Sequence, residues 1–160
     1  MTKRTRRNSA GFTLIELLVV VLIIGILASI AIPQYFKVVE RARIAEAEAF
    51  ISSIKQAQER YLARQGTYVT SMANIGNLDI NLPPATSNYG VKFYTPSLGA
   101  GTGTGCATGD PFYAITMTRL LANAGVAPRY SPAAYVATYE RCTGAIDYGS
   151  CANCNLDFKN

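Results

Sequence analysis

The feature that most constrains this chain is a long apolar run near its start. The twenty residues from Leu17 to Phe36 carry no formal charge and are mostly Leu, Val, Ile and Ala. As a helix rising about 1.5 Å per residue, they would cover roughly 30 Å, the thickness of the hydrocarbon core of a bilayer. A short basic leader, residues 1–11, precedes them. Positive charge tends to stay in the cytoplasm, so we expect a cytoplasmic N-terminus and a non-cytoplasmic remainder.

Composition excludes several classes of protein. The chain has 160 residues, of which 49% are hydrophobic and 16% are charged, and it contains neither His nor Trp. This leaves room for one modest domain and argues against a disordered tail or a coiled-coil rod. Without His, no catalytic site can be built on an imidazole base. The formal net charge is +5, and four positive charges lie in the leader: Lys3, Arg4, Arg6 and Arg7. The excess of basic residues therefore belongs to the leader and does not indicate a basic surface patch.

The apolar run allows three interpretations. It can be a secretory signal cut after Ala31, at the small residues Ser29-Ile30-Ala31. It can be a plain signal anchor that is never cut. In the third interpretation, the small residues Ser9-Ala10-Gly11 before the run form the cleavage site. A cut there would leave the apolar helix on the mature protein.

Glu16 is an acid placed within the apolar segment. An ionisable group at membrane depth is costly and needs a partner or solvent, which makes Glu16 a candidate functional residue. The alternative is an acid close enough to the membrane surface to stay hydrated.

The order of these residues resembles a known signal. The string Gly11-Phe12-Thr13-Leu14-Ile15-Glu16, the aliphatic run to Ile32 and the following Pro33-Gln34-Tyr35 closely resemble the class III signal of type IV prepilins. The resemblance covers residues 7–68 well and the remainder only in general layout. It implies that a membrane prepilin peptidase cuts between Gly11 and Phe12 and methylates the new amine of Phe12. It also implies that Glu16 pairs with the terminal ammonium of a neighbouring subunit.

The resemblance further implies where the protein goes and what it meets. It is expected to be a single-pass precursor in the bacterial inner membrane, embedded in the lipid bilayer before assembly. The inner-membrane pilus assembly machinery would then join it to identical or related subunits in an extracellular filament. In the family, the helix loosens near the positions of Gly25 and Pro33 during packing. Both residue types can kink a helix, although membrane helices often tolerate them.

Beyond residue 36 the pattern changes to an amphipathic helix, residues 37–65. Apolar residues recur at steps of three and four, as expected for one buried face: Ala47, Phe50, Ile51, Ile54, Ala57, Tyr61 and Leu62. Gly66 is predicted to cap the C-terminus of this helix. The amphipathic half needs a sheet to cover its apolar face.

Residues 66–160 supply candidates for that sheet. Residues 89–95, 112–119 and 133–141 alternate or are rich in β-branched and aromatic residues, which predicts strands. Residues 99–109 are rich in Gly and Thr and predict a flexible loop. We therefore predict an α+β fold of pilin type, in which a long N-terminal helix packs on a small antiparallel sheet.

Four cysteines lie in this second part, and their non-cytoplasmic location favours disulfides. The spacing of Cys151 and Cys154 resembles a redox or zinc half-site, but a second such pair and a His are absent from the sequence. A bridge between these two closes a small ring that is usually strained, so we expect each to pair with one of Cys106 and Cys142. No metal or cofactor is predicted.

Nothing in the sequence indicates an enzyme. The stretch Gly99–Gly105 lacks the Lys-Ser/Thr ending of a phosphate-binding loop, and no pair of acids stands out as catalytic. From the resemblance we expect a structural pilus subunit that serves adhesion, twitching motility or DNA uptake. The alternatives are a pseudopilin of a type II secretion system and, from another class, a secreted disulfide-bonded binding domain. A membrane-anchored enzyme is the weakest alternative, and nucleic-acid binding stays undecided.

Overall fold

The computed structural model describes residues 11–82, 89–119, 125, 129–130, 135–149 and 151–158. The chain divides into two compact units, Met1–Phe36 and Lys37–Asn160, which are described separately. Expectations that concern leader residues 1–10 lie outside the described residues.

One long helix, α1, runs from Leu14 to Gln65. Its first 23 residues belong to the first unit and its remainder to the second. The helix ends where the sequence predicts, because Gly66 adopts a left-handed conformation with φ of 73°. The Gly66 N–H donates a 2.8 Å hydrogen bond to the carbonyl of Leu62, which closes the last turn.

The second half of α1 buries one face, as its apolar spacing predicts. All but two of the expected residues are buried, and Tyr61 and Leu62 pack partly buried against the same core. Two polar side chains, Glu40 and Gln58, are buried on this face as well. Gln58 is satisfied by the chain that follows the helix: its Nε2 donates to the carbonyl of Val69 at 2.6 Å, and its Oε1 accepts from the N–H of Val69 at 2.9 Å. The side-chain amide of Gln58 thus pairs with both backbone polar groups of Val69, as a neighbouring strand would do.

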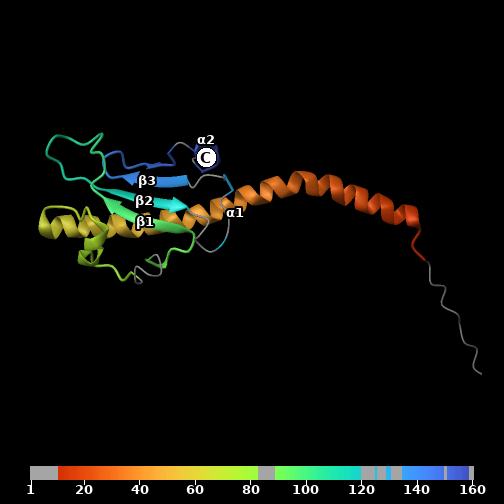
Figure 1. Cartoon of the computed structure of the whole chain (residues 1–160), viewed down its shortest axis with the longest axis horizontal. Helices are drawn as coiled ribbons and strands as arrows, with labels where there is room; N and C mark the ends of the chain where they lie inside the picture. Colours follow the sequence, from red (N-terminus) through yellow and green to blue (C-terminus); the bar gives the residue numbers. More distant parts are fainter. Residues whose placement is uncertain are drawn as a thin grey trace, which may run out of the picture. The chain divides into compact units, whose positions relative to one another are not determined.

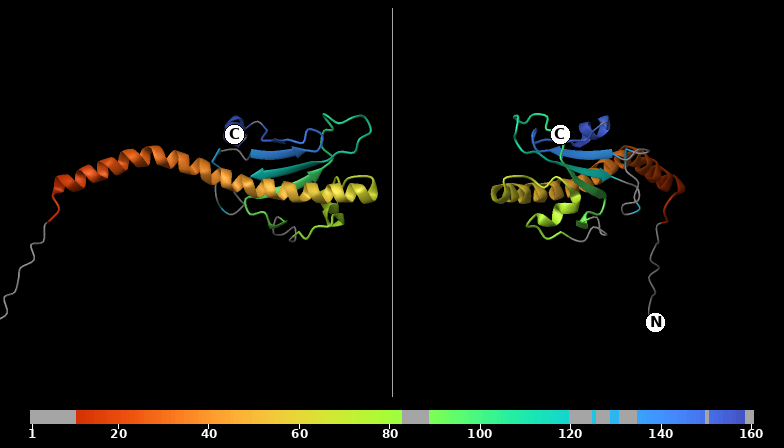
Figure 2. Two further views of the ribbon diagram at one scale, coloured as in Figure 1. Left: turned by 180° about the vertical axis from the view of Figure 1, so that it is seen from behind. Right: turned by 60° about the vertical axis from the view of Figure 1, so that its left-hand side comes forward.

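A four-stranded antiparallel sheet covers this half of α1 (Figures 1 and 2). Its strands follow chain order: β1 (Tyr94–Gly99), β2 (Ala114–Arg119), β3 (Tyr135–Glu140) and β4 (Ile146–Asp147). Alternate residues of the three longer strands are buried, which is the pattern of a sheet with one face on a helix. The predicted α+β fold is therefore confirmed.

The first strand begins later than predicted. Tyr89 has φ of 55°, which no strand residue adopts, and strand pairing starts only at Tyr94. The N–H groups of Lys92 and Phe93 instead donate to the carboxylate of Glu46 in α1, at 2.8 and 3.2 Å. A side chain of the helix therefore takes the backbone donors that a strand partner would otherwise bind.

Two short helices and a turn-rich connection complete the second unit. The 3₁₀ helix η1 (Met72–Asn77) lies between α1 and β1 in the sequence, and α2 (Ala152–Phe158) ends the described chain. Residues 100–113 join β1 to β2 at the same end of the sheet as the C-terminus of α1 (Figure 1). This connection contains hydrogen-bonded turns, with Cys106 N–H donating to Gly103 and Asp110 N–H to Ala107, both at 3.1 Å.

Candidate functional site

The predicted processing site lies just before α1. Gly11 and Phe12 are exposed and outside the helix, which begins at Leu14. The hydroxyl oxygen of Thr13 accepts a 3.3 Å hydrogen bond from the N–H of Glu16, so Thr13 is the N-cap of the helix. Glu16 is exposed in the first turn of α1. The structure thus places the predicted residues together at the start of the helix.

Beyond Glu16, the first half of α1 is an apolar surface that the described chain leaves open. The apolar surface extends from Leu14 to Phe36, and almost every side chain on it is exposed; Leu14 is 83% exposed and Ile30 67%. The helix is long and apolar enough to cross a membrane, a property that signal sequences share. Such a surface needs lipid or other helices to cover it.

Gly25 and Pro33 break neither helix α1 nor its apolar surface. Helix α1 continues through both residues. A Cβ atom at Gly25 would meet nothing within 4 Å. No packing among the described residues therefore requires Gly at this position, and a role of Gly25 and Pro33 in filament packing stays a prediction.

The cysteines form two disulfides, but in a pairing that differs from the expected one. Cys106 bonds to Cys142, and Cys151 bonds to Cys154. The expectation that Cys151 and Cys154 pair with the other two was wrong. Cys151 immediately precedes α2 and Cys154 lies one turn into it, with 5.2 Å between their Cα atoms. A helical turn brings residues three apart to the same side, so the short ring closes there without a distant partner.

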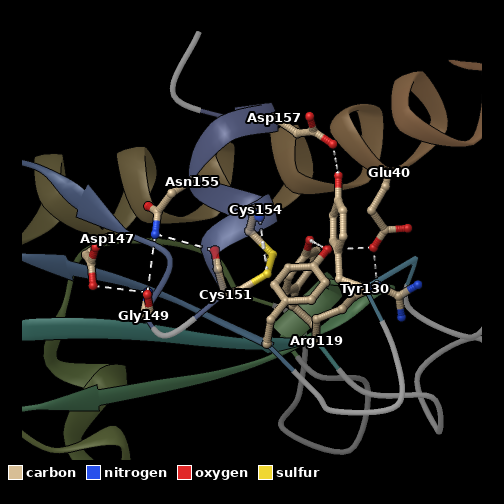
Figure 3. Close-up of a disulfide and its surroundings, with 11 residues drawn as sticks. Glu40, Arg119, Tyr130, Asp147, Gly149, Cys151, Cys154, Asn155 and Asp157 are labelled. Carbon is tan, nitrogen blue, oxygen red and sulfur yellow. Dashed lines mark hydrogen bonds and ion pairs between the residues drawn. A yellow bond between two sulfur atoms is a disulfide. The ribbon is translucent and has the colours of Figure 1, made fainter.

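Sequence reasoning missed a buried polar network between α1 and the sheet. Glu40 of α1 and Arg119 of β2 are both fully buried, and Arg119 Nε lies 3.0 Å from Glu40 Oε1 (Figure 3). The hydroxyl of Tyr135 donates to the same carboxylate oxygen at 2.6 Å, and Arg43 Nη1 donates to the other at 2.7 Å. Tyr94 completes the network with a 3.0 Å hydrogen bond between its hydroxyl and that of Tyr135.

Electrostatics of the network follow from these contacts. Burial alone would raise the pKa of Glu40, but hydrogen bonds from Tyr135, Arg43 and Arg119 hold it below its ordinary value. Burial raises the pKa of Tyr135, and its hydrogen bond to the carboxylate adds to that effect. Glu40 is therefore an anion and Tyr135 a neutral donor at neutral pH. The sequence held one sign of this network. Glu40 lies four residues before buried Ile44 and so falls on the apolar face of α1, where an acid is unexpected.

Helix α2 contacts α1 near residue 37, where the second half of α1 begins. Tyr130 donates a hydrogen bond to the carboxylate of Asp157, and Lys37 Nζ lies 3.4 Å from the same carboxylate. Arg41 donates a 3.1 Å hydrogen bond to the carbonyl of Asp157. The hydrogen bond from Tyr130 and the charge of Lys37 both lower the pKa of Asp157. The other acid of this C-terminal segment, Asp147, has a different partner: its carboxylate accepts a 3.0 Å hydrogen bond from the N–H of Gly149.

Cations and aromatic rings gather at the opposite end of the sheet, near the C-terminus of α1. Arg141 Nε donates to the hydroxyl of Tyr68 at 2.9 Å and lies 3.6 Å from a carboxylate oxygen of Glu59. Lys55 Nζ lies 4.5 Å from the centre of the Tyr139 ring. Both rings are buried, so these tyrosines offer no free face for stacking. Among the described residues, no group of three or more His, Cys, Asp or Glu could hold a metal ion.

Fold and site together define a class of protein: the α+β proteins of pilin type, in which one long helix presents an apolar half and supports a sheet with the other. Sequence comparison agrees with this. Residues 6–32 match the family model "Prokaryotic N-terminal methylation motif", and residues 33–131 match "Type IV minor pilin ComP, DNA uptake sequence receptor". The second match covers well over half of the chain, so the chain belongs to the type IV pilin family. The resemblance seen in the sequence is thereby confirmed.

Individual relatives include pilus proteins and a type II secretion protein. The chain is 34% identical over 85 residues to the "Type IV wide pilus major component PilA4" of Thermus thermophilus, which covers 53% of this chain and 65% of that protein. A "Fimbrial protein" of Pseudomonas aeruginosa is 39% identical over 93 residues, covering 58% of this chain and 54% of the relative.

The "Type II secretion system core protein G" of Escherichia coli is 32% identical over 99 residues, covering 61% of this chain and 68% of the relative. The chain spans 65% and 54% of the two pilus proteins, so less than two thirds of their length.

Proposed function

We propose that the protein is a structural subunit of a type IV pilus that polymerises through the first half of α1. The exposed apolar surface from Leu14 to Phe36 carries this proposal. Before assembly, lipid covers this surface; in the filament, the helices of other subunits replace the lipid. Van der Waals packing and polar pairing can drive such an exchange, although one apolar environment replaces another.

Processing comes first in this scheme. Prepilin peptidase cuts between Gly11 and Phe12 and methylates the amine of Phe12, while the precursor spans the inner membrane with its N-terminus in the cytoplasm. A glycine before the cut lets the protease approach the backbone closely. We expect Gly11→Val to leave the uncut precursor in the membrane, whereas the control Gly25→Ala is cut normally. A mature chain that begins at Ile32 would contradict this scheme and indicate a secreted domain.

The carboxylate of Glu16 sets the position of neighbouring helices along one another during assembly. A carboxylate in a bundle of apolar helices is costly unless a cation lies close by. Cleavage gives every subunit an ammonium on Phe12, about one turn before its own Glu16, and the methylated ammonium of a neighbouring subunit is such a cation. Pairing the two would fix how far adjacent helices slide past one another, and Gly25 and Pro33 would let the helices approach and bend.

Substitution of Glu16 tests the pairing without changing the size of the side chain. We expect Glu16→Gln to insert and be cut normally, because a neutral amide is cheaper to bury, yet to form few filaments. The measurement is the ratio of surface filament to processed subunit in the membrane. Asp110→Asn is the matched control, since it removes one exposed carboxylate far from α1 in sequence. An unchanged ratio in Glu16→Gln would overturn the pairing.

DNA binding is a second candidate, favoured by the description of the matched family as a DNA uptake sequence receptor. The second unit offers exposed cations near the C-terminus of α1, among them Arg60 and Arg64, which are about half exposed beside Asp79. Such side chains can contact phosphates, and each contact steepens the dependence of binding on salt. We expect Arg64→Gln to weaken binding of double-stranded DNA and to lower the salt slope by about 1.

Lys92→Gln is the control for that measurement. Lys92 is exposed beside the start of β1, away from the C-terminus of α1, and its loss should leave the salt slope unchanged. Fluorescence anisotropy of labelled DNA over a salt series measures both variants. Equal slopes for Arg64→Gln and the native chain would remove Arg64 from any DNA-binding surface.

A pseudopilin of a type II secretion system is the alternative within the same superfamily, and the relative from Escherichia coli favours keeping it. Deletion of the gene separates the two. Loss of surface filaments with normal protein secretion supports the pilus subunit, and the reverse result supports the pseudopilin.

A further inference from the structure

We propose that the second unit binds the headgroups of anionic phospholipids through a basic cluster made of Lys37, Arg41 and Arg129. The inference rests on one part of the proposed function, a precursor whose apolar surface spans the membrane, and it does not depend on filament assembly. Two independent observations carry it: the positive charge gathered around Asp157, and the exposed apolar side chains beside that charge.

Three cations surround one carboxylate in the basic cluster. Lys37 Nζ lies 3.4 Å from Asp157 Oδ1, and Arg41 Nη1 donates a 3.1 Å hydrogen bond to the backbone carbonyl of Asp157. The guanidinium carbon of Arg129 lies 5.6 Å from the centre of the Tyr130 ring, whose hydroxyl donates to the carboxylate of Asp157 (Figure 3). That hydrogen bond lowers the pKa of Asp157, and the charges of Lys37 and Arg129 add to the effect. An excess of positive charge therefore remains for a further anion.

Lys37 and Arg41 are accessible to such an anion. The side chain of Lys37 is 44% exposed, against 21% for that of Asp157, and Arg41 is exposed. The acid that lies between them in α1, Glu40, is fully buried and paired within the network described above, so it does not neutralise the cluster. Ammonium and guanidinium groups are strong donors to phosphate oxygens. A phospholipid headgroup therefore suits this cluster.

Two exposed apolar side chains lie beside the basic cluster in the sequence. Val38 follows Lys37 in α1, and Leu156 precedes Asp157 in α2; they are 67% and 66% exposed. Among the described residues of the second unit, these two are the only exposed large hydrophobic side chains. Cations together with exposed apolar side chains suit the boundary between headgroups and acyl chains. The apolar side chains favour a lipid over free phosphate or the backbone of DNA, neither of which presents an acyl chain.

The chain itself carries the basic cluster to the membrane surface. The apolar surface of α1 ends at Phe36, and Lys37 is the next residue. Consecutive Cα atoms lie about 3.8 Å apart, so Lys37 lies within a few Å of the end of the apolar surface, whatever the arrangement of the two units. A long basic side chain can reach the headgroups from there. In a precursor with a cytoplasmic N-terminus, these headgroups belong to the outer leaflet.

Spin-labelled lipids test the proposal on the full chain in phosphatidylcholine vesicles. Electron paramagnetic resonance measures how much labelled lipid the protein immobilises, with the label on either phosphatidylglycerol or phosphatidylcholine. Each Lys or Arg near a membrane surface changes association with anionic lipid by up to roughly fivefold. We expect the native chain to prefer phosphatidylglycerol, and Lys37→Gln/Arg41→Gln to lower that preference roughly threefold or more. An unchanged preference in this variant overturns the proposal.

Three further variants exclude other causes, and the leader is the same in all of them. Arg60→Gln/Arg64→Gln removes as many charges near the C-terminus of α1 and should leave the preference unchanged. Lys37→Arg/Arg41→Lys keeps both charges and should keep the preference. Asp157→Asn removes the negative charge of the cluster and should raise the preference, whereas damage to the fold would lower it. A lower preference in Asp157→Asn with unchanged circular dichroism, or equal losses in the two variants that remove cations, overturns the proposal.

Extraction with alkaline carbonate separates this inference from the proposed function. A native chain that carbonate releases from the vesicles does not span the membrane, and both proposals then fail. A native chain that resists extraction but shows no preference for phosphatidylglycerol overturns the headgroup site alone. Weaker binding of double-stranded DNA by Lys37→Gln/Arg41→Gln, without a change in lipid preference, also overturns it and assigns the cluster to DNA.

Discussion

The carboxylate of Glu40 in α1 and the guanidinium of Arg119 in β2 form an ion pair at 3.0 Å in which neither side chain is accessible to solvent. This pair joins the helix to the sheet across 79 residues of sequence. Tyr135 binds the same carboxylate oxygen, so a single acid contacts two neighbouring strands. Glu40 is also close to the boundary between the two units, which places the network where the apolar half of α1 ends.

Removal of Glu40 should be costly. We expect Glu40→Ala to lower the free energy of unfolding by about 3–5 kcal/mol, because the guanidinium of Arg119 then stays buried without this carboxylate. Asp79→Ala is the matched control, since it removes an acid that pairs with Arg60 and Arg64 at the surface. We expect a much smaller loss there. Chemical denaturation of the full chain in micelles measures both, and equal losses would contradict the role of the buried pair.

The same carboxylate predicts how stability depends on pH. The pKa of Glu40 is lower in the folded protein than its ordinary value of 4.5, so the unfolded chain binds the proton more readily. The contribution of Glu40 is complete above the ordinary pKa and is lost as the pH falls through the lower, folded pKa. We expect a flat profile from Glu40 above about pH 5 and a decline in more acidic solution.

The variant Glu40→Gln shows how much of the loss of stability at low pH is due to Glu40. This variant should be less stable at neutral pH but should lose less stability on acidification than the native chain. Asp157 also has a lowered pKa, because of Tyr130 and Lys37, so part of the decline should persist. Parallel profiles for the variant and the native chain would assign the whole decline to other carboxylates.

The sequence predicts elements whose determinants are local, and this explains what it missed. The buried face of α1 follows from the spacing of residues such as Ile51 and Ile54, and the end of the helix follows from Gly66. The start of β1 depends on Glu46, which binds backbone groups 46 and 47 residues away. No local pattern reveals such a contact.

The cysteines and the buried network show the same limit. The number of cysteines predicts disulfides, but their pairing depends on the turn that carries Cys151 into α2. Glu40 could have been noticed as an acid in phase with the apolar face of α1. Its partners Arg119 and Tyr135 could not, because the register of the sheet decides which strand residues face the helix. The residues of the predicted processing site, by contrast, are contiguous, so a local pattern is enough to predict them.

The connection between β1 and β2 offers a test of close packing at glycine. Gly101 has φ of 77°, and a Cβ atom there would lie 2.6 Å from Glu140 Oε2 and 3.2 Å from the backbone carbon of Tyr113. We expect Gly101→Ala to destabilise the protein by about 1–3 kcal/mol, since the conformation is strained and the space is occupied. The neighbouring N–H of Thr102, which donates to Glu140 at 3.3 Å, would lose its partner as well.

Gly109 separates the two causes. It also has a left-handed conformation, with φ of 94°, but a Cβ atom there would meet none of the described residues within 4 Å. Gly109→Ala should therefore show the backbone strain alone, and thermal denaturation of both variants gives the cost of the close approach as a difference. If the two variants were equally stable, the contact of the connection with Glu140 would contribute nothing measurable.

The last prediction concerns Thr13, whose hydroxyl accepts the N–H of Glu16 at the start of α1. Thr13→Val keeps the shape of the side chain but removes the acceptor, and N-cap losses of this kind cost about 0.5–2 kcal/mol. The first turn should then open more often, because the N–H of Glu16 has no partner within the helix at this position.

Thr13→Ser keeps the hydroxyl and is the control. Hydrogen exchange of the Glu16 amide in micelles should be faster in Thr13→Val and native-like in Thr13→Ser. If Glu16 pairs with the Phe12 ammonium of a neighbouring subunit, as proposed above, fewer filaments per processed subunit should accompany the faster exchange. Faster exchange with normal filament yield would show that the cap orders the helix without positioning Glu16.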